Sequence, residues 1–529
     1  MNEKSELEKI LEKFSRAGQV EVHEDGQWLA ELAGLSFELH VKGEEQVLHL
    51  WSDLGNLTRR VVKIEEETED RLTLLVSRFG AEHPGKLEFL LAKSLRPVRR
   101  VTREQFRARF GRMLAEQFPD ARAKDLTTGE YLQNSFPGTY PRCLLKEENN
   151  EWAVMGVSPS EPDRTKEAIL SFGLLWLDVL RRQQQKQKEK HPRSKGARIS
   201  GLRLILPENA IRVTNQRLQA ISPDAKVEIY EFSTSTWLLR RIERGDTGNV
   251  ESRLTQWHDA EASLLSASRY AERIRALAPG AIRMRIPAGS RETEFRFHGL
   301  EFARCKENQI QFGLAEPRRA VNDYNWNELK ALVRELELRR NALAEDRNHP
   351  LYRAAPERWL EELVRAEPAR LDAQLDARHL YSQAPAFSGG DRGVMDLLGV
   401  TRRGRLVVIE LKASEDIHLP LQAVDYWQRV RTHQRDGNFQ RYGYFTGIEL
   451  DQRPPLLWLV APELRFHPST NAILQFISRE IQITKIGLNE NWRRGWRVVS
   501  RKSGVSPAVP MFAAANENAR FARVSRAGA

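Results

Sequence analysis

Apolar residues along the chain change repeatedly between helix-like and strand-like spacing. From Leu7 to Phe14 they recur every three or four positions, which predicts a short amphipathic helix within residues 1–18. Residues 19–100 mostly alternate between apolar and polar positions, as in LSFELHV and QVLHLW. This alternation is typical of half-buried strands, so we predict a β-rich module there.

The next segment, residues 101–235, mixes both patterns. Helical spacing over 101–120 is followed by a hairpin-like pair, RCLLKEENNEWAVMGV, and by a long helix ending at LLWLDVLRR. A strand (GLRLILP), a helix (TNQRLQAI) and a strand (KVEIYEF) complete it. The polar, basic stretch QQQKQKEKHPRSKGAR, which begins at Gln183, is predicted to be a solvated loop.

The same order of patterns then returns. Residues 236–348 contain a predicted surface helix at 254–277, strand-like alternation at 281–314 and a charged helix from Trp326 to Ala344. Strong α/β patterning occupies 349–500, and the Ala-, Ser-, Gly- and Asn-rich residues 501–529 are predicted to be a disordered tail.

Three segments resemble later segments in the same order, at separations of roughly 250 to 265 residues. AGLSFELHVKGEEQVLHL resembles HGLEFARCKENQIQFGL, and EYLQNSFPGTYPRCLL resembles HLYSQAPAFSGGDRGVMDLL. LRLILPENAIRVTNQRLQAIS resembles LWLVAPELRFHPSTNAILQFIS; the matched residues are Pro207 with Pro462, Asn215 with Asn471, Gln219 with Gln475, and Ser222 with Ser478. We therefore expect two copies of a β module followed by an α/β module.

Composition narrows the possible partners. The 529 residues include 83 Lys and Arg against 72 Asp and Glu, a formal charge of +11, which suits a polyanion such as nucleic acid. The two cysteines, Cys143 and Cys305, make a disulfide framework or a thiolate zinc site unexpected. No apolar run is long enough to span a membrane, so we expect a cytoplasmic protein without a membrane partner.

The most informative segment is GGDRGVMDLLGVTRRGRLVVIELKASEDIHLPLQAVDYWQRV. Its pattern predicts a strand, a tight turn at Arg402-Arg403-Gly404, a second strand and a helix. Glu410 and Lys412 are two positions apart on the second strand and therefore share a face, and the hairpin can bring Asp396 beside them. Charges at the end of the apolar run LVVIELKA are costly to bury, and a bound divalent ion would make the arrangement sensible.

Phosphodiester hydrolysis requires this combination of groups. Two carboxylates with carbonyl and water oxygens suit Mg²⁺ or Mn²⁺, so Asp396 and Glu410 are the candidate metal ligands. Lys412 is a cation that can position the attacking water or stabilise charge on the phosphorane.

Asp396 followed by Glu410-Leu411-Lys412 resembles the D…ExK signature of the PD-(D/E)xK nuclease superfamily. In its RecB-type branch a later helix carries Q-x-x-x-Y, and Gln422 and Tyr426 stand at that place here. These two residues share a helix face and would orient the groups around the metal. Met395 stands where the signature has proline, which is a common variation in the superfamily.

Many superfamily members also carry a glutamate on the first helix of the fold. Within PERWLEELV the best match is Glu361, with Glu357 and Glu362 as rivals. A β module placed before the nuclease also resembles the domain order of NucS-type endonucleases. The resemblance implies an α/β (α+β) chain with a restriction-endonuclease-like domain at 349–500, preceded by a degenerate copy and two smaller β-rich modules.

The first copy lacks the chemistry. Aligned by sequence, Cys143 falls opposite Asp396, and Gly156-Val157-Ser158 falls opposite Glu410-Leu411-Lys412. Phe172 and Trp176 replace Gln422 and Tyr426. We therefore expect a pseudo-dimer with one active and one degenerate half.

Other signals carry less information. Gly80-AEHP-Gly85-Lys86 nearly matches a phosphate-binding loop, but Leu87 stands where Ser or Thr must bind Mg²⁺, so a turn next to a strand is predicted. His379, His418 and His433 flank the candidate site without the spacing of a zinc centre.

The segment from Trp492 to Arg497 interleaves Trp and Arg. This pattern fits either base stacking with phosphate contact or core Trp beside exposed Arg.

The sequence thus favours a Mg²⁺- or Mn²⁺-dependent nuclease acting on DNA. The alternatives are a nucleic-acid-binding scaffold that keeps the fold without catalysis, and a structural protein whose basic surface serves solubility alone. Retention of the whole D…ExK set favours the enzyme over the scaffold.

Overall fold

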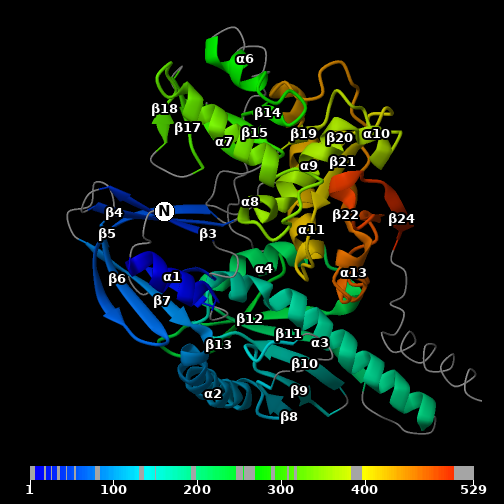
Figure 1. Ribbon diagram of the computed structural model, residues 1–529. Helices are drawn as coiled ribbons and strands as arrows, with labels where there is room; N and C mark the ends of the chain where they lie inside the picture. Colours follow the sequence, from blue (N-terminus) through cyan, green and yellow to red (C-terminus); the bar gives the residue numbers. More distant parts are fainter. Residues whose placement is uncertain are drawn as a thin grey trace, which may run out of the picture. The chain divides into compact units, whose positions relative to one another are not determined.

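The computed structural model shows a mixed α/β protein (Figure 1). The structure describes residues 6–16, 20–24, 27–31, 36–42, 45–52, 55–77, 84–129, 136–148, 150–191, 198–245, 254, 269–286, 292–306, 309–314, 318–382 and 396–504. The strands in these ranges form four sheets. In the described ranges, no helix combines the length and the apolar composition needed to cross a membrane.

The chain divides into two compact units, each made of two separate stretches of sequence. The first unit contains Met1–Gln105 and His258–Leu363, and the second contains Phe106–Trp257 and Val364–Ala529. The β-rich segments fall in the first unit and the α/β segments in the second.

The first stretch of the first unit is a helix with an antiparallel sheet. Leu7, Leu11 and Phe14 of α1 are buried in one core with apolar residues of the strands, as their spacing predicts. The sheet has the order β2-β1-β7-β6-β5-β4-β3. The elements are α1 (Glu6–Arg16), β1 (Val20–Glu24), β2 (Gln27–Glu31), β3 (Ser36–Lys42), β4 (Glu45–Ser52), β5 (Gly55–Glu67), β6 (Arg71–Ser77) and β7 (Gly85–Leu91).

The second stretch is a five-stranded meander with helices. Its core joins Phe295, Phe297 and Phe302 of the sheet to Trp326 and Leu329 of α7. The elements are α6 (Arg269–Arg275), β14 (Ile282–Arg285), β15 (Thr293–Phe297), β16 (Leu300–Lys306), β17 (Gln309–Phe312), β18 (Arg319–Ala320), α7 (Trp326–Arg339), α8 (Pro350–Arg353) and α9 (Pro356–Ala366), whose last turn continues into the second unit.

The second unit has an N-terminal half, Phe106–Trp257, and a C-terminal half, Val364–Ala529. The N-terminal half contains α2 (Ala92–Gln117, from Phe106 onward), β8 (Arg122–Thr127), β9 (Arg142–Lys146), β10 (Asn150–Gly156), α3 (Asp163–Lys190), β11 (Arg198–Pro207), α4 (Ile211–Leu218), β12 (Val227–Phe232) and β13 (Leu239–Ile242). The C-terminal half contains α10 (Pro368–Leu371), β19 (Tyr381–Ser382), β20 (Leu397–Val400), β21 (Leu406–Leu411), α11 (Leu419–Arg435), α12 (Asn438–Arg441), β22 (Leu456–Pro462), α13 (Thr470–Leu474), β23 (Gln482–Leu488) and β24 (Val498–Ser503).

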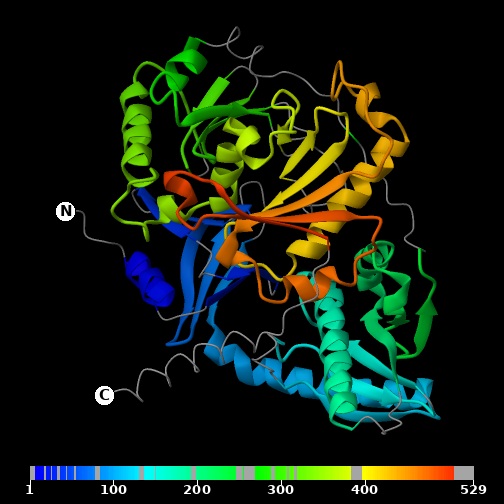
Figure 2. The ribbon, with the colours of Figure 1, turned by 90° about the vertical axis from the view of Figure 1, so that its right-hand side faces the viewer.

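The sheets of the two halves have the same topology. The strands follow chain order in both, from β8 to β13 and from β19 to β24. Successive pairings are antiparallel, antiparallel, parallel, parallel and antiparallel in each sheet. A long helix, α3 or α11, joins the third strand to the fourth and packs on them (Figure 2). The likeness of the two segments therefore extends from sequence to strand order.

The two halves meet through equivalent residues. Ile221 and Ile477 form an isolated antiparallel bridge. The amide of Ser222 donates to the carbonyl of Phe476 at 2.7 Å, and the amide of Ser478 donates to the carbonyl of Ala220 at 2.8 Å. Each bond is the symmetry mate of the other, so a local pseudo-two-fold axis passes between the isoleucines, as in an isologous dimer. A single hydrophobic core contains residues of both halves.

Two predicted boundaries are wrong. The stretch from Gln183 is not a loop throughout, because α3 extends to Lys190; the polar side chains that suggested a loop are good helix formers and continue as an exposed helix. Strand β24 runs to Ser503, so Arg501 and Lys502 pair with β23 and the tail does not begin at residue 501. Most of the surface helix predicted at 254–277 lies outside the described residues, as does the tail from 505 onward.

Candidate active site

The hairpin of β20 and β21 holds the acidic residues of the candidate site. The predicted tight turn is confirmed: the amide of Gly404 donates to the carbonyl of Thr401 at 2.8 Å. Gly404 has a φ of +80°, and a Cβ there would lie 2.0 Å from the carbonyl oxygen of Glu449, so only glycine fits. The turn sets a register in which Leu397 pairs with Ile409.

This register places Asp396, one residue before Leu397, across from Glu410. The Oδ2 atom of Asp396 accepts a hydrogen bond from the amide of Leu411 at 2.8 Å. Glu410 is only 4% exposed, because β21 is buried along its whole length between the neighbouring strands and helices. Two carboxylates from adjacent strands therefore share one enclosed position, as the sequence predicts.

Lys412 continues the strand and carries the positive charge of the site. Its Nζ lies 4.0 Å from Oε1 of Glu410 and 3.1 Å from Oδ2 of Asp416. Burial lowers the pKa of Lys412, but the carboxylates of Glu410, Asp416 and Asp396 outweigh burial and raise the pKa above its usual value. The amine therefore carries a positive charge beside the carboxylates.

Helix α11, which packs on β21 and β22, carries Gln422 and Tyr426. The side-chain oxygen of Gln422 is buried, and among the described residues it accepts no hydrogen bond. Burial raises the pKa of the Tyr426 phenol, and the charges of Glu410 and Asp396 raise this pKa further. The phenol is therefore close enough to both carboxylates to interact with them electrostatically. The structure thus brings Asp396, Glu410, Lys412 and Tyr426 close together. Gln422 lies one turn before Tyr426 on the same helix, and its place in the site stays a prediction.

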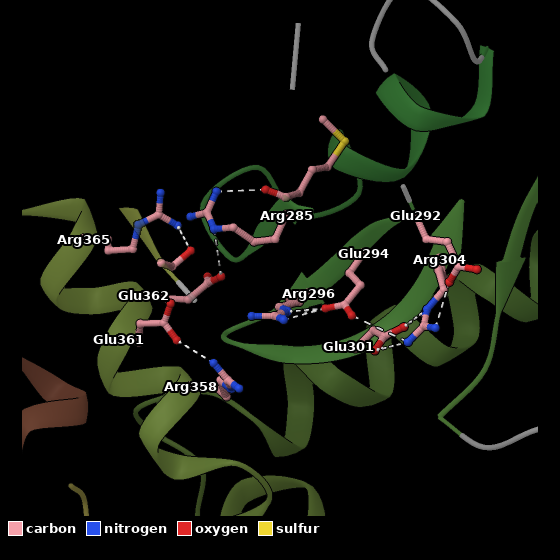
Figure 3. A network of polar contacts seen from close by, with 12 residues as sticks. Arg285, Glu292, Glu294, Arg296, Glu301, Arg304, Arg358, Glu361, Glu362 and Arg365 are labelled. Atoms are coloured by element: carbon pink, nitrogen blue, oxygen red, sulfur yellow. Dashed lines mark hydrogen bonds and ion pairs between the residues drawn. The ribbon is translucent and has the colours of Figure 1, made fainter. Parts of the chain in front are cut away.

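Glu361, the predicted helix carboxylate, lies on α9 among the residues of the first unit. It is 2% exposed, and its Oε2 accepts a hydrogen bond from Nη1 of Arg358 at 3.1 Å (Figure 3). Its rival Glu362 lies 4.0 Å from Nε of Arg285, and Glu357 lies in the first turn of α9. The recorded partners of Glu361 and Glu362 are therefore arginines, and the assignment of a helix carboxylate to the site stays a prediction.

The donor set of the hairpin suits a hard divalent cation. Among the described residues, no group of three or more His, Cys, Asp or Glu side chains is arranged to hold a metal. Mg²⁺ keeps several water ligands and is commonly held by one or two carboxylates together with substrate phosphates. Asp396 and Glu410 meet that requirement, whereas a closed zinc site requires four protein ligands.

The flanking histidines belong to the surrounding structure. His379 lies 3.5 Å from Asp376, His418 lies 3.3 Å from Ser171, and His433 is buried beside Asn438 at 3.0 Å. At the end of the chain, Trp492 and Trp496 are each 3% exposed. Their indole rings are therefore core residues, and of the two interpretations of the Trp–Arg segment, buried Trp beside more exposed Arg is the one observed.

The N-terminal half carries different chemistry at the equivalent position. The amide of Lys412 donates to the carbonyl of Val460, and the amide of Val157 donates to the carbonyl of Ile205. Val460 and Ile205 are equivalent residues of the two halves. Val157 therefore stands in the place of Lys412, and Met155 in the place of Glu410. The sequence alignment there is wrong by one residue. Such a shift turns each side chain to the opposite face of a strand, and the alignment had no polar residue to fix the register.

In this register Met155 pairs with Arg142 of β9, just as Glu410 lies across from Asp396. The N-terminal counterpart of Asp396 is therefore Arg142, not Cys143. Arg142 is 4% exposed, and its guanidinium lies 5.0 Å from the ring of Phe136 and 5.6 Å from that of Trp176. Burial lowers the pKa of this guanidinium. Two apolar residues and an enclosed cation therefore occupy the position, and this set offers no ligand to a metal.

Several residues of the site were not predicted from the sequence. Asp416 pairs with Lys412, and its position four residues later is the only local signal for the contact. Arg217 and Ser171 contact α11 from the N-terminal half, and no pattern in the sequence connects segments so far apart.

Comparison of the chain with protein-family models, with curated proteins and with solved structures found no significant match.

Proposed function

We propose that this protein is a metal-dependent nuclease of the PD-(D/E)xK type that hydrolyses DNA phosphodiester bonds, with one active site per chain. The observation that carries the proposal is the hairpin, where Asp396 accepts the amide of Leu411 beside the buried Glu410 and the charged Lys412. The shared strand order of the two halves supports a restriction-endonuclease-like fold for both, with the N-terminal half degenerate.

Asp396 and Glu410 would hold Mg²⁺ or Mn²⁺. When bound, the ion supplies a Lewis acid for the phosphate oxygens and lowers the pKa of a coordinated water. Lys412, whose Nζ lies 4.0 Å from Glu410 and 3.1 Å from Asp416, would stabilise negative charge that develops on the phosphate.

Gln422 and Tyr426 have complementary hydrogen-bonding roles. The amide oxygen of Gln422, which has no hydrogen-bond donor among the described residues, can accept a hydrogen bond from the attacking water. The raised pKa of Tyr426 keeps its hydroxyl protonated, so it can donate to a carboxylate or to phosphate. The net charge of +11 favours a polyanionic substrate, and DNA is the one we propose.

A catalytically inactive DNA-binding scaffold is the second candidate. It is favoured by the lack, among the described residues, of a third metal-binding side chain beside the two carboxylates. The scaffold would bind DNA with the same salt dependence but would not cut it.

Incubation of the purified protein with single-stranded, duplex and flapped DNA and with RNA tests the proposal. Each substrate is used with Mg²⁺, Mn²⁺ or EDTA. We expect cleavage of DNA with either metal and none with EDTA or in Glu410→Gln. Glu480→Gln, a change of an exposed carboxylate in the same half, is the matched control and should cleave normally. Metal-dependent cleavage by Glu410→Gln at the wild-type rate would reject this site.

A further inference from the structure

Helix α11, which carries Gln422 and Tyr426, is held by a buried ion pair from the N-terminal half. Nε of Arg217 on α4 donates to both carboxylate oxygens of Asp425 at 3.1 and 3.0 Å, and Nη2 donates to Oδ2 at 2.8 Å. Nη1 donates to the carbonyl of Glu167 on α3 at 2.8 Å. The guanidinium therefore fastens Asp425, the residue directly before Tyr426, to two helices of the other half.

The first turn of α11 has a second contact with the same half. Nδ1 of His418, at the start of the helix, lies 3.3 Å from Oγ of Ser171, which is fully buried on α3. The amide of His418 donates to Oδ1 of Asp416 at 2.8 Å, and Oδ2 of Asp416 pairs with Lys412 at 3.1 Å. A continuous series of polar contacts thus runs from Ser171 to the cation of the candidate site.

These contacts do not obey the pseudo-two-fold symmetry. The shift in residue number that makes Ile477 the equivalent of Ile221 also makes Ile473 the equivalent of Arg217. Ile473 is a buried apolar residue. The sequence match of α3 with α11 places Leu175, also buried, opposite Asp425. The ion pair therefore supports only the helix of the C-terminal half, although the surrounding interface is symmetric.

Orientation of such a helix matters for the chemistry. In the proposed mechanism Gln422 and Tyr426 would act through hydrogen bonds, which require close placement. Groups that support a metal site typically change metal affinity or activity by about 10- to 100-fold when they are removed. A buried arginine with two acceptors fixes an angle as well as a distance, because the guanidinium is planar.

We propose that Arg217 and Ser171 of the N-terminal half are positioning residues for the active site of the C-terminal half. Arg217 acts through Asp425 on Tyr426 and Gln422, and Ser171 acts through His418 and Asp416 on Lys412. The degenerate half is then a built-in support for the site. This inference rests on the proposed nuclease function.

The test compares Arg217→Met with Arg203→Met. Arg203 is an equally buried arginine of the N-terminal half that pairs with Glu147 at 2.6 Å and Glu228 at 2.9 Å, within its own sheet. Both changes remove a buried ion pair and should lower the melting temperature. A purely structural role predicts the same enzymology for both, measured as the single-turnover rate constant of the folded fraction.

We expect Arg217→Met to lower that rate constant, or to raise the Mn²⁺ concentration for half-maximal rate, by about 10- to 100-fold, with DNA affinity unchanged. Arg203→Met should keep both values. Arg217→Lys, which keeps the charge but loses the planar fork, should recover part of the loss, and Ser171→Ala should show a smaller loss of the same kind. Equal rate constants for Arg217→Met and Arg203→Met would overturn the inference.

Hydrogen exchange of the α11 amides gives a readout that does not depend on activity. Amides from Gln422 to Tyr426 should exchange faster in Arg217→Met than in Arg203→Met at matched stability. A wild-type protein that never cleaves would reject the nuclease proposal alone, and the exchange comparison would still decide whether Arg217 holds the helix. Unchanged exchange would reject the positioning role even in an active enzyme.

Discussion

Ile221 forms an antiparallel bridge with Ile477, its own equivalent in the other half of the second unit. The pair marks a pseudo-two-fold axis that relates the two halves. The C-terminal half carries the carboxylates of Asp396 and Glu410, and the N-terminal half has Arg142 at the position of Asp396. In a symmetric nuclease dimer the two active centres cut opposite strands. In the proposed nuclease, Met155, Val157 and Arg142 at the matching position of the N-terminal half would offer no metal ligand.

We therefore predict that one chain nicks duplex DNA and does not make paired cuts. Supercoiled plasmid digested by monomeric protein should give open circles first, with linear DNA appearing only after independent nicks accumulate. Ultracentrifugation must show that the protein is monomeric in the reaction, because two chains could bring two active halves together. Direct conversion of supercoiled to linear DNA by the monomer would contradict the prediction.

Replacement of Asp396 by Asn or of Lys412 by Ala should reduce cleavage to background, while duplex binding stays within about twofold because most affinity comes from other phosphate contacts. Asp396→Asn removes a carboxylate but keeps an oxygen for the amide of Leu411, so the hairpin should persist. Lys412→Ala leaves Glu410 and Asp416 without their shared cation. Cleavage and fluorescence-anisotropy binding are measured on the same samples, and circular dichroism controls for folding. Normal cleavage by Lys412→Ala would remove the cation from the mechanism.

The basic surface should make DNA affinity fall steeply with salt, because each neutralised phosphate releases condensed counterions. Lys186, Lys188 and Lys190 are exposed on the last turns of α3 and are candidate phosphate contacts. Changing all three to Gln should weaken binding and reduce the slope of log K against log salt by up to about three. The dissociation constant is measured from low to high salt for both proteins. An identical slope would place the DNA path away from α3.

His298 should make the first unit sensitive to acid. Its ring stacks on Trp359 with centroids 5.0 Å apart, and burial, with the nearby Arg340 and Arg283, lowers its pKa from 6.5 to about 4. Because the unfolded chain binds the proton more readily, this contribution is fully present above pH 6.5 and is lost as the pH falls towards 4. It amounts to at most about 3 kcal/mol.

His298→Asn tests this contribution, since Asn tolerates the positive φ of 42° at this position. The variant loses the stacking and should melt at a lower temperature at neutral pH. The difference between its melting temperatures at pH 7.5 and 4.5 should nevertheless be smaller than in the wild type. An unchanged difference would mean that other groups cause the acid sensitivity.

The sequence was informative wherever the decisive pattern was local. The alternation that places Glu410 and Lys412 on one face, the turn at Gly404 and the helical spacing of Gln422 and Tyr426 each lie within a few residues. The structure has the hairpin, the turn and the helix where these patterns predict them. The register of the N-terminal half was not predictable in this way. Apolar residues fill both faces of its central strands, so nothing distinguished Cys143 from Arg142 as the counterpart of Asp396.

Contacts between distant segments were also beyond the sequence. Arg217 and Asp425 are separated by 208 positions, and each belongs to an ordinary amphipathic helix when considered alone. Glu361 shows a related limit. A glutamate on the helix that precedes the hairpin in sequence matches the pattern of the resembled family, whether its carboxylate binds a metal or, as in this structure, Arg358.

The long separation of Arg217 from Asp425 has a consequence for synthesis. At about 5 to 20 residues per second, Arg217 leaves the ribosome about 10 to 40 s before its partner. During this interval the N-terminal half presents Ile221 and Arg217, whose carboxylate partner Asp425 does not yet exist. A nascent chain in this state can pair with the same surface of another nascent chain, since the interface is close to self-complementary. Slow translation between the two halves would therefore favour association between chains over the pairing within one chain that completes the native core.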